Sequence, residues 1–261
     1  MLDLPLGWAT DLAVLEHTGS LVEDHGDHLV VRTPANPDFH WGNCLVVTDP
    51  TAVDDARRWV ATFRSAFPAA AWVAIGLPRL PAAAYAWAEE GLDLEEDDVL
   101  ATDALPDLTP LAAGYAVRRI EGPDWGQVVA RAVAANERTG EHDPTGYARF
   151  ARAQARVRRS LSERDVAAFF GAFADDTLVA DLGIVRCGTT ARYQDVGTDP
   201  AHRRRGLAAH LLGVAARWAA GSGCGRFVIV TGATNPAGRV YRRLGFRPTA
   251  ASVQAYRRPP R

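Results

Sequence analysis

The segment that most constrains the fold runs from Val196 to Leu212 and reads as a strand end, an arginine-rich loop and a helix start. After Gly206, apolar side chains recur at helical spacing, which predicts a helix with one buried face. The first backbone N–H groups of a helix have no partner within it, and the helix dipole adds partial positive charge there. The segment therefore predicts a pyrophosphate site. Its expected contributors are Arg203, Arg204, Arg205, Gly206, Leu207, Ala208 and Ala209.

Two motifs in this order resemble a known family. Residues 203–208 follow the pattern R-x-x-G-x-A, which resembles the pyrophosphate loop of the GNAT superfamily of acyl-CoA-dependent N-acyltransferases. Residues 235–246 resemble that family's downstream segment, N…Y-x-x-x-G-F, at about the usual separation. Each motif follows a predicted strand. The pair is therefore far more specific than either pattern alone.

The resemblance implies roles for individual residues. The backbone of Val196 and Thr198 would pair with the amides of the pantetheine arm of acetyl-CoA, and Asn235 would hydrogen-bond that arm. Tyr241 would protonate the leaving thiolate, since a phenol with a pKa near 10 is protonated at neutral pH. Two plainer interpretations stay open. Asn235 suits the cap of the following helix, and Tyr241 suits a core aromatic.

The general base is the least constrained assignment. Glu137, in the first-helix region that usually lines the acceptor pocket, is the candidate, while an exposed helix-end carboxylate and deprotonation through water both remain open. By strand alternation, Arg192 and Gln194 should face the same side as Val196, with Asp195 pointing away.

The order of elements repeats along the chain. Residues 47–50 mirror residues 197–200, and residues 81–92 mirror residues 235–246. We therefore expect an α/β fold of two tandem GNAT-like domains, residues 1–108 and 114–261, each a mostly antiparallel mixed sheet flanked by helices. Residues 53–58 of the first copy hold two acids and no glycine, so that copy is expected to be degenerate and not to bind acyl-CoA.

Composition narrows the class of protein. The 261 residues include 3 cysteines, too few and too scattered for a disulfide framework or a metal site, and all 29 basic residues are arginine. The sequence shows no signal peptide and no membrane-spanning run, so a cytoplasmic protein is expected. Residues 1–110 carry 5 arginines and 19 acids, net −14, whereas residues 111–261 carry 24 and 12, net +12. The acidic half would repel nucleic acid and suits docking on the basic half.

These features together predict an N-acetyltransferase. It would transfer an acetyl group from acetyl-CoA, without a metal, to a primary amine of a small-molecule or peptide acceptor. A non-catalytic acyl-CoA sensor and a protein-interaction module built on the charge asymmetry are the alternatives. No membrane or nucleic-acid partner is expected, and a homodimer is left open.

Overall fold

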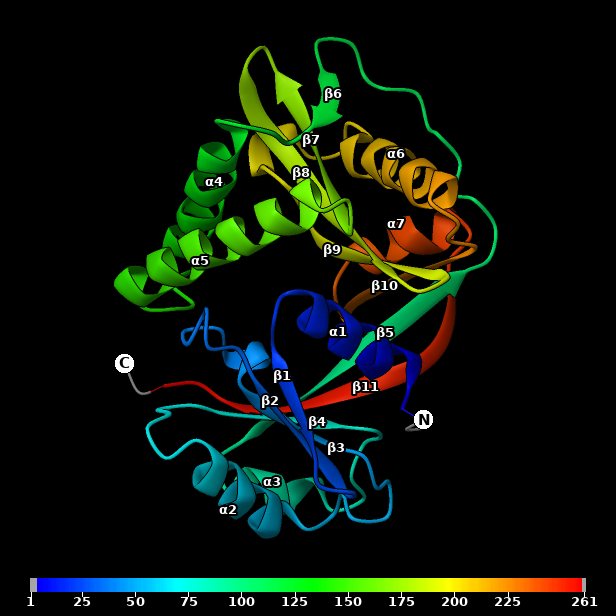
Figure 1. The fold of residues 1–261 in the computed structure, drawn as a ribbon. Coiled ribbons are helices and arrows are strands. Elements are labelled where there is room, and N and C mark those ends of the chain that lie inside the picture. Colours follow the sequence, from blue (N-terminus) through cyan, green and yellow to red (C-terminus); the bar gives the residue numbers. More distant parts are fainter. Residues whose placement is uncertain (1–3, 260–261) are drawn as a thin grey trace. The chain divides into compact units, whose positions relative to one another are not determined.

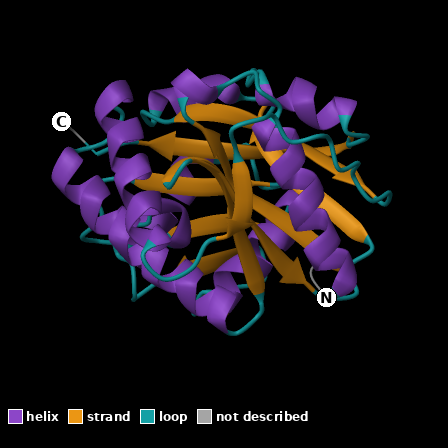
Figure 2. Cartoon of the chain, turned by 90° about the horizontal axis from the view of Figure 1, so that it is seen from above, coloured by secondary structure: helices purple, strands orange, loops and turns teal. Residues whose placement is uncertain are grey.

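The computed structural model describes residues 4–259, so Met1 to Asp3, the start of the stretch considered for a signal peptide, lie outside the described part. The chain divides into two compact units. Of the described residues, 4–99, 230–238 and 248–259 form the first, and residues 100–229 and 239–247 form the second. Within the described residues, eleven strands make up mixed sheet structure that is flanked by helices (Figures 1 and 2). The expected α/β fold class is confirmed.

Six strands lie mainly in the first unit, in the order β1-β2-β3-β4-β11-β5. Their bounds are Leu21–Asp24 (β1), His28–Arg32 (β2), Cys44–Val47 (β3), Val73–Leu77 (β4), Asp93–Thr102 (β5) and Arg247–Arg257 (β11). The pairs β1–β2, β2–β3 and β4–β11 are antiparallel, whereas β3 and β4 are parallel. A parallel pair needs a crossover connection, and helix α2 supplies it.

Tryptophans anchor the core of the first unit. Its helices are α1 (Leu6–His17), α2 (Ala56–Ala66) and α3 (Ala84–Glu89), with a short 3-10 helix at His40–Gly42. The indole of Trp8 donates to the Leu77 carbonyl across 3.1 Å, which fixes α1 on β4. Trp59 and Trp87 are fully buried, and their indoles donate to carbonyls of residues 52 and 53. Each large apolar side chain therefore also satisfies its polar atom.

The sequence pattern does not predict two strands of this unit, β1 and β5. Strand β5 carries four consecutive acidic residues, 95–98, which obscure the apolar alternation that marks a strand. Helix α2 begins at Ala56, because the Asp55 carboxylate accepts a hydrogen bond from the Arg58 N–H and caps the helix there.

The second unit contains the remaining strands in the order β10-β9-β8-β7-β6. They span Ala116–Arg119 (β6), Ala167–Ala174 (β7), Thr177–Cys187 (β8), Thr190–Thr198 (β9) and Arg226–Gly232 (β10). Neighbours from β6 to β9 are antiparallel, and β9 and β10 are parallel. The second unit therefore repeats the strand–helix–strand crossover of the first.

Helices cover both faces of this second sheet. They are α4 (Asp124–Thr139), α5 (Pro144–Glu163), α6 (Leu207–Gly221) and α7 (Ala237–Arg243), with a 3-10 helix at Pro200–His202. Helix α6 packs on β7, β8 and β9 from one face, where the buried Tyr193 hydroxyl donates to the Leu212 carbonyl. Helices α4 and α5 lie on the other face (Figure 1), where Arg131 of α4 meets Asp181 of β8. In the described part of the chain, no helix is long and apolar enough to cross a membrane.

The proline-flanked connection between the two repeats runs along helix α6. The Thr109 carbonyl accepts a hydrogen bond from His210 Nδ1, and the Pro106 carbonyl accepts one from Arg217 Nη1. Strand β11 at the other end of the chain pairs with β4. The expected domains, residues 1–108 and 114–261, remain a prediction about the two sequence repeats. The compact units are defined instead by contacts in space, such as those of residues 106–109 with α6 and of β11 with β4.

We expect Gly213→Ala to destabilise the second unit. A Cβ at Gly213 would lie 2.6 Å from the Asp107 carbonyl oxygen and 3.0 Å from the Leu108 Cα, and both are backbone atoms. Overpacking of this kind costs about 1–3 kcal/mol, which lowers Tm by roughly 2–4 °C per kcal/mol in a protein of this size. The matched control is Gly126→Ala in α4, where no atom lies within 4 Å and Tm should hold or rise. Equal Tm values for the two variants, measured by calorimetry, would contradict the close approach.

Candidate functional site

The arginine-rich loop joins β9 to α6 through a backbone that only certain residues adopt. After the 3-10 turn at Pro200–His202, Arg204 has a φ of +62° and Gly206 a φ of +76°. Gly206 is the N-cap residue of α6. A left-handed φ is readily available to glycine but costs other residues conformational energy. The glycine of the R-x-x-G-x-A pattern is therefore required by the turn itself.

The start of α6 offers unsatisfied backbone donors. Gly206 has no side chain to cap the helix, and the first turn contains no acidic residue. The first helical hydrogen bond runs from the His210 N–H to the Gly206 carbonyl, so the N–H groups of Leu207, Ala208 and Ala209 precede that ladder. Residues 203–206 are exposed. An anion could therefore reach these donors directly.

The side chains of the loop are partly held in place. Arg203 Nε donates to the Thr198 carbonyl across 3.2 Å, which ties the loop back to β9. The Arg205 guanidinium lies 5.9 Å from the centre of the Tyr115 ring, and the Tyr115 hydroxyl is 2.9 Å from His202 Nδ1. Arg204 is exposed. Positive charge therefore gathers around the start of α6.

Strand β9 contains a bulge just before the loop. Gly183 pairs with Gln194 and Asp181 pairs with Gly197, so β9 holds one residue more than β8 between these pairs. Asp195, with a φ of +50°, lies in this irregularity, and its carboxylate pairs with Arg158 of α5.

The bulge overturns the expected alternation. It places Gln194 and Gly197 on one face of the sheet, so Val196 faces the opposite side from Gln194. Asp195, which alternation alone would point away from Gln194, instead reaches α5 and pairs with Arg158. The sequence offers only a weak signal for it, since Asp tolerates a left-handed φ better than most residues.

The segment through Val196 and Thr198 also extends beyond the parallel ladder. That ladder pairs residues 190–192 of β9 with residues 226–228 of β10, and β9 then continues to Thr198. Val196, Gly197 and Thr198 are partly exposed. They lead directly into the arginine-rich loop.

Tyr241 lies in α7 with only 5% of its surface exposed. Its ring meets Phe246 edge to face, with ring centres 6.5 Å apart. Burial raises the pKa of Tyr241 to about 12, because the charged phenolate is poorly solvated there. The ring therefore packs in the core, and its hydroxyl keeps its proton at neutral pH, while the acid role stays a prediction.

Asn235 is exposed and initiates α7. Its side-chain oxygen accepts a hydrogen bond from the Ala237 N–H across 2.9 Å, the capping arrangement anticipated as the plainer alternative. The side-chain NH₂ group takes no part in this contact, because only the amide oxygen accepts a hydrogen bond. A second role as a donor is compatible with the cap.

Glu137 is exposed in the last turn of α4. The connection that follows is ordered by its own hydrogen bonds. Asn136 exchanges two bonds with the backbone of His142, and the Asp143 carboxylate caps α5 at the Gly146 N–H. The carboxylates here are helix caps or exposed groups.

A partly buried ionic cluster on the α4–α5 face is absent from the sequence-based candidates. Arg131 Nη1 lies 3.0 Å from Asp181 Oδ1, and Arg131 Nε lies 3.5 Å from Asp199 Oδ1. The side chains of Arg131 and Asp181 are 15% and 19% exposed. No motif could identify this cluster, because its members come from α4, β8 and the end of β9 and meet only after folding.

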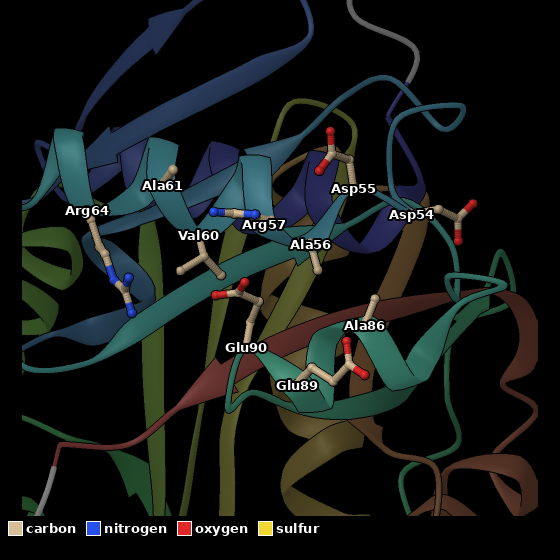
Figure 3. A pocket seen from close by; sticks show the side chains of 10 residues that line it. All are labelled: Asp54, Asp55, Ala56, Arg57, Val60, Ala61, Arg64, Ala86, Glu89 and Glu90. Atoms are coloured by element: carbon tan, nitrogen blue, oxygen red, sulfur yellow. The ribbon is translucent and has the colours of Figure 1, made fainter.

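The first unit has a pocket of about 570 Å³ between α2 and α3 (Figure 3). It is lined by Asp54, Asp55, Ala56, Arg57, Val60, Ala61, Arg64, Ala86, Glu89 and Glu90. The Asp55 carboxylate caps α2, and Asp54 accepts hydrogen bonds from the Ala83 N–H and from Arg79. The helix start that corresponds to that of α6 is therefore already occupied by carboxylates.

Among residues 4–259, no group of three or more His, Cys, Asp or Glu side chains is arranged to hold a metal ion. The candidate site in the second unit thus consists of backbone donors, arginines and one buried phenol.

Comparison with known proteins identifies this part of the chain. Residues 127–246 match the model of the Acetyltransferase (GNAT) family, the family that the two sequence motifs resemble. The search of curated proteins found no significant match.

Solved structures match over most of the chain. A GCN5-related N-acetyltransferase from Kribbella flavida shares 19% identity at a TM-score of 0.66, covering 97% of this chain and 96% of that one. A GCN5-related N-acetyltransferase from Sphaerobacter thermophilus shares 17% identity at a TM-score of 0.56, covering 90% of this chain and 82% of that one. A tandem GNAT protein from the clavulanic acid biosynthesis pathway shares 16% identity at a TM-score of 0.55, covering 93% of this chain and 84% of that one. At these identities the likeness concerns the fold, which is that of GNAT proteins.

Proposed function

We propose that this chain is an N-acyltransferase that takes an acetyl group from acetyl-CoA and transfers it to a primary amine. The observation that carries the proposal is the start of α6. It is an uncapped, exposed helix N-terminus beside three arginines, and it lies inside a GNAT domain. Backbone N–H groups and guanidinium groups are the donors that a pyrophosphate prefers. The donor set therefore fits the charged part of acetyl-CoA.

The chain's own residues would divide the work as follows. Arg203, Arg204 and Arg205 with the N–H groups of Leu207, Ala208 and Ala209 would hold the pyrophosphate, next to Gly206. The backbone of Val196 and Thr198 and the amide of Asn235 would hold the pantetheine arm. Acetyl-CoA supplies an acyl carbon activated as a thioester.

Tyr241 would give the proton that the leaving sulfur needs. The phenol carries its proton throughout the neutral range, as a proton donor must. Glu137 is the sequence-based candidate for the base, and its exposure gives that role little support.

The first unit would be a degenerate copy that binds no acyl-CoA. Asp55 supports this, since its carboxylate takes the place that a phosphate would need at the start of α2. The acceptor would be a small-molecule or peptide amine, with a homodimer left open and no nucleic-acid or membrane partner. Cys44, Cys187 and Cys224 are free thiols, which suits a reducing cytoplasm.

Calorimetric titration of the full chain tests the proposal. We expect one acetyl-CoA site of micromolar affinity. Acetyl-pantetheine, which lacks the pyrophosphate, should bind at least about 100-fold more weakly if charge-assisted contacts contribute about 1.5–3 kcal/mol each. Release of free CoA with a panel of primary amines then tests transfer. Absence of acetyl-CoA binding would overturn the assignment, and binding without CoA release for any amine would favour the sensor.

A further inference from the structure

We propose that Asp181 is the general base of the second unit and takes a proton from the acceptor ammonium beside the bulge of β9. This inference rests on the proposed transfer to an amine and names a base that no motif assigns. Its starting point is the position of the carboxylate. Asp181 on β8 pairs directly with Gly197 on β9, between the two residues whose backbone is proposed to hold the pantetheine arm.

The surroundings leave space beside this carboxylate. Gly197 has no side chain, and a Cβ placed there would lie 3.7 Å from Asp181 Oδ1 and 3.6 Å from Arg131 Nη2. The space that a side chain at residue 197 would fill therefore lies next to the Asp181 carboxylate, on the side of β9. A side chain at residue 197 would separate Asp181 from any group held along that strand.

Arg131 attracts the Asp181 carboxylate without occupying it with well-aligned hydrogen bonds. Arg131 approaches to 3.0 Å, yet its Nε and Nη1 atoms make no hydrogen bond, so the attraction is that of charges rather than of aligned donors. A carboxylate that accepted several well-aligned N–H bonds would be a weak base. Asp181 therefore remains able to accept a proton.

Charges of both signs face Asp181. Arg131 from α4 and Arg158 from α5 favour the carboxylate, while Asp195 of β9 and Asp199 just after β9 oppose it. Arg158 is itself paired with Asp195, and Arg131 also contacts Asp199. Burial outweighs the arginines and raises the pKa of Asp181 to about 6. A base with a pKa near the working pH is the most effective one for proton transfer.

The proton balance of the step is simple. An N–H bond of the ammonium breaks, its electron pair stays on nitrogen as the lone pair that can attack, and an O–H bond forms on Asp181. Asp181 then returns this proton to water, so no other reactant is needed.

Asp181→Asn removes the basicity with almost no change in shape, and Asp176→Asn in the exposed turn before β8 is the matched control. We expect Asp181→Asn to bind acetyl-CoA as the wild type does and to release CoA at least about 100-fold more slowly. Wild-type turnover should fall below about pH 6, and this acid limb should disappear from the residual activity of Asp181→Asn. The control should match the wild type throughout.

A second measurement needs no acceptor amine and no catalytic activity from the variant. In ¹³C NMR of the aspartate carboxyl groups of the wild-type protein alone, one resonance should titrate near pH 6. The same resonance should be absent in Asp181→Asn.

The outcomes separate the two proposals. A wild type that turns over beside an equally active Asp181→Asn variant would overturn the base alone. So would a wild type that has no acid limb and no carboxyl titrating near pH 6, even if the variant fails to fold. A wild type that releases no CoA with any amine would overturn the transferase, and the base with it.

Discussion

Gly206→Asp should abolish acetyl-CoA binding while leaving the protein folded. The substitution places a carboxylate at the N-cap of α6, where the N–H groups of the first turn are open and the helix dipole favours an anion. A covalently attached anion would occupy the proposed phosphate position and repel the ligand. The first unit shows the same arrangement naturally, since Asp55 caps α2. We expect a loss of affinity of at least about 100-fold, measured by calorimetric titration.

Two further variants separate charge from backbone strain. Gly206→Asn has nearly the same shape and a similar tolerance for a left-handed φ, but no charge. It should therefore retain more affinity than Gly206→Asp. Gly188→Asp places the same residue at another left-handed glycine, with a φ of +65° and no neighbour within 4 Å, in the turn between β8 and β9. It should bind acetyl-CoA normally. Unchanged affinity in Gly206→Asp would remove the pyrophosphate assignment.

The loop could be predicted from sequence because its chemistry is local. An uncapped helix start is defined by neighbouring residues, and the glycine at residue 206 marks both the turn and the missing cap. The same holds for most helices and for strands such as β7 and β10, whose apolar residues form nearly continuous runs. The acidic strand β5 could not be recognised, because its partners and not its own pattern make it a strand.

The ionic cluster could not be predicted for a different reason. Arg131, Asp181 and Asp199 are far apart in sequence, and each alone is typical of an exposed charge. The bulge at Asp195 then reverses the side-chain alternation on which the sequence argument about β9 relied. A base sought near the first helix, at Glu137, therefore lies on an exposed helix end, while a partly buried carboxylate, Asp181, is on β8.

Tyr241→Phe tests the other half of the proton balance. The substitution keeps the ring that packs against Phe246 and removes only the hydroxyl. If Tyr241 protonates the leaving sulfur, turnover should fall about 100-fold, the lower range for a positioned acid, with acetyl-CoA affinity nearly unchanged. Because burial raises the pKa of Tyr241 to about 12, the wild-type rate should not decline through loss of this proton below about pH 10.

The matched control for this variant is Tyr85→Phe in α3, where the side chain is 70% exposed and the same atom is lost without consequence. Stopped-flow release of CoA for both variants, beside calorimetric acetyl-CoA affinities, separates chemistry from binding. Equal turnover in Tyr241→Phe and the wild type would assign the proton to water and leave Tyr241 as a core aromatic. A selective loss in Tyr241→Phe, together with a lost acid limb in Asp181→Asn, would place the acid on α7 and the base on β8. Proton donor and proton acceptor would then come from separate elements of the fold, with the acyl group held between them by β9.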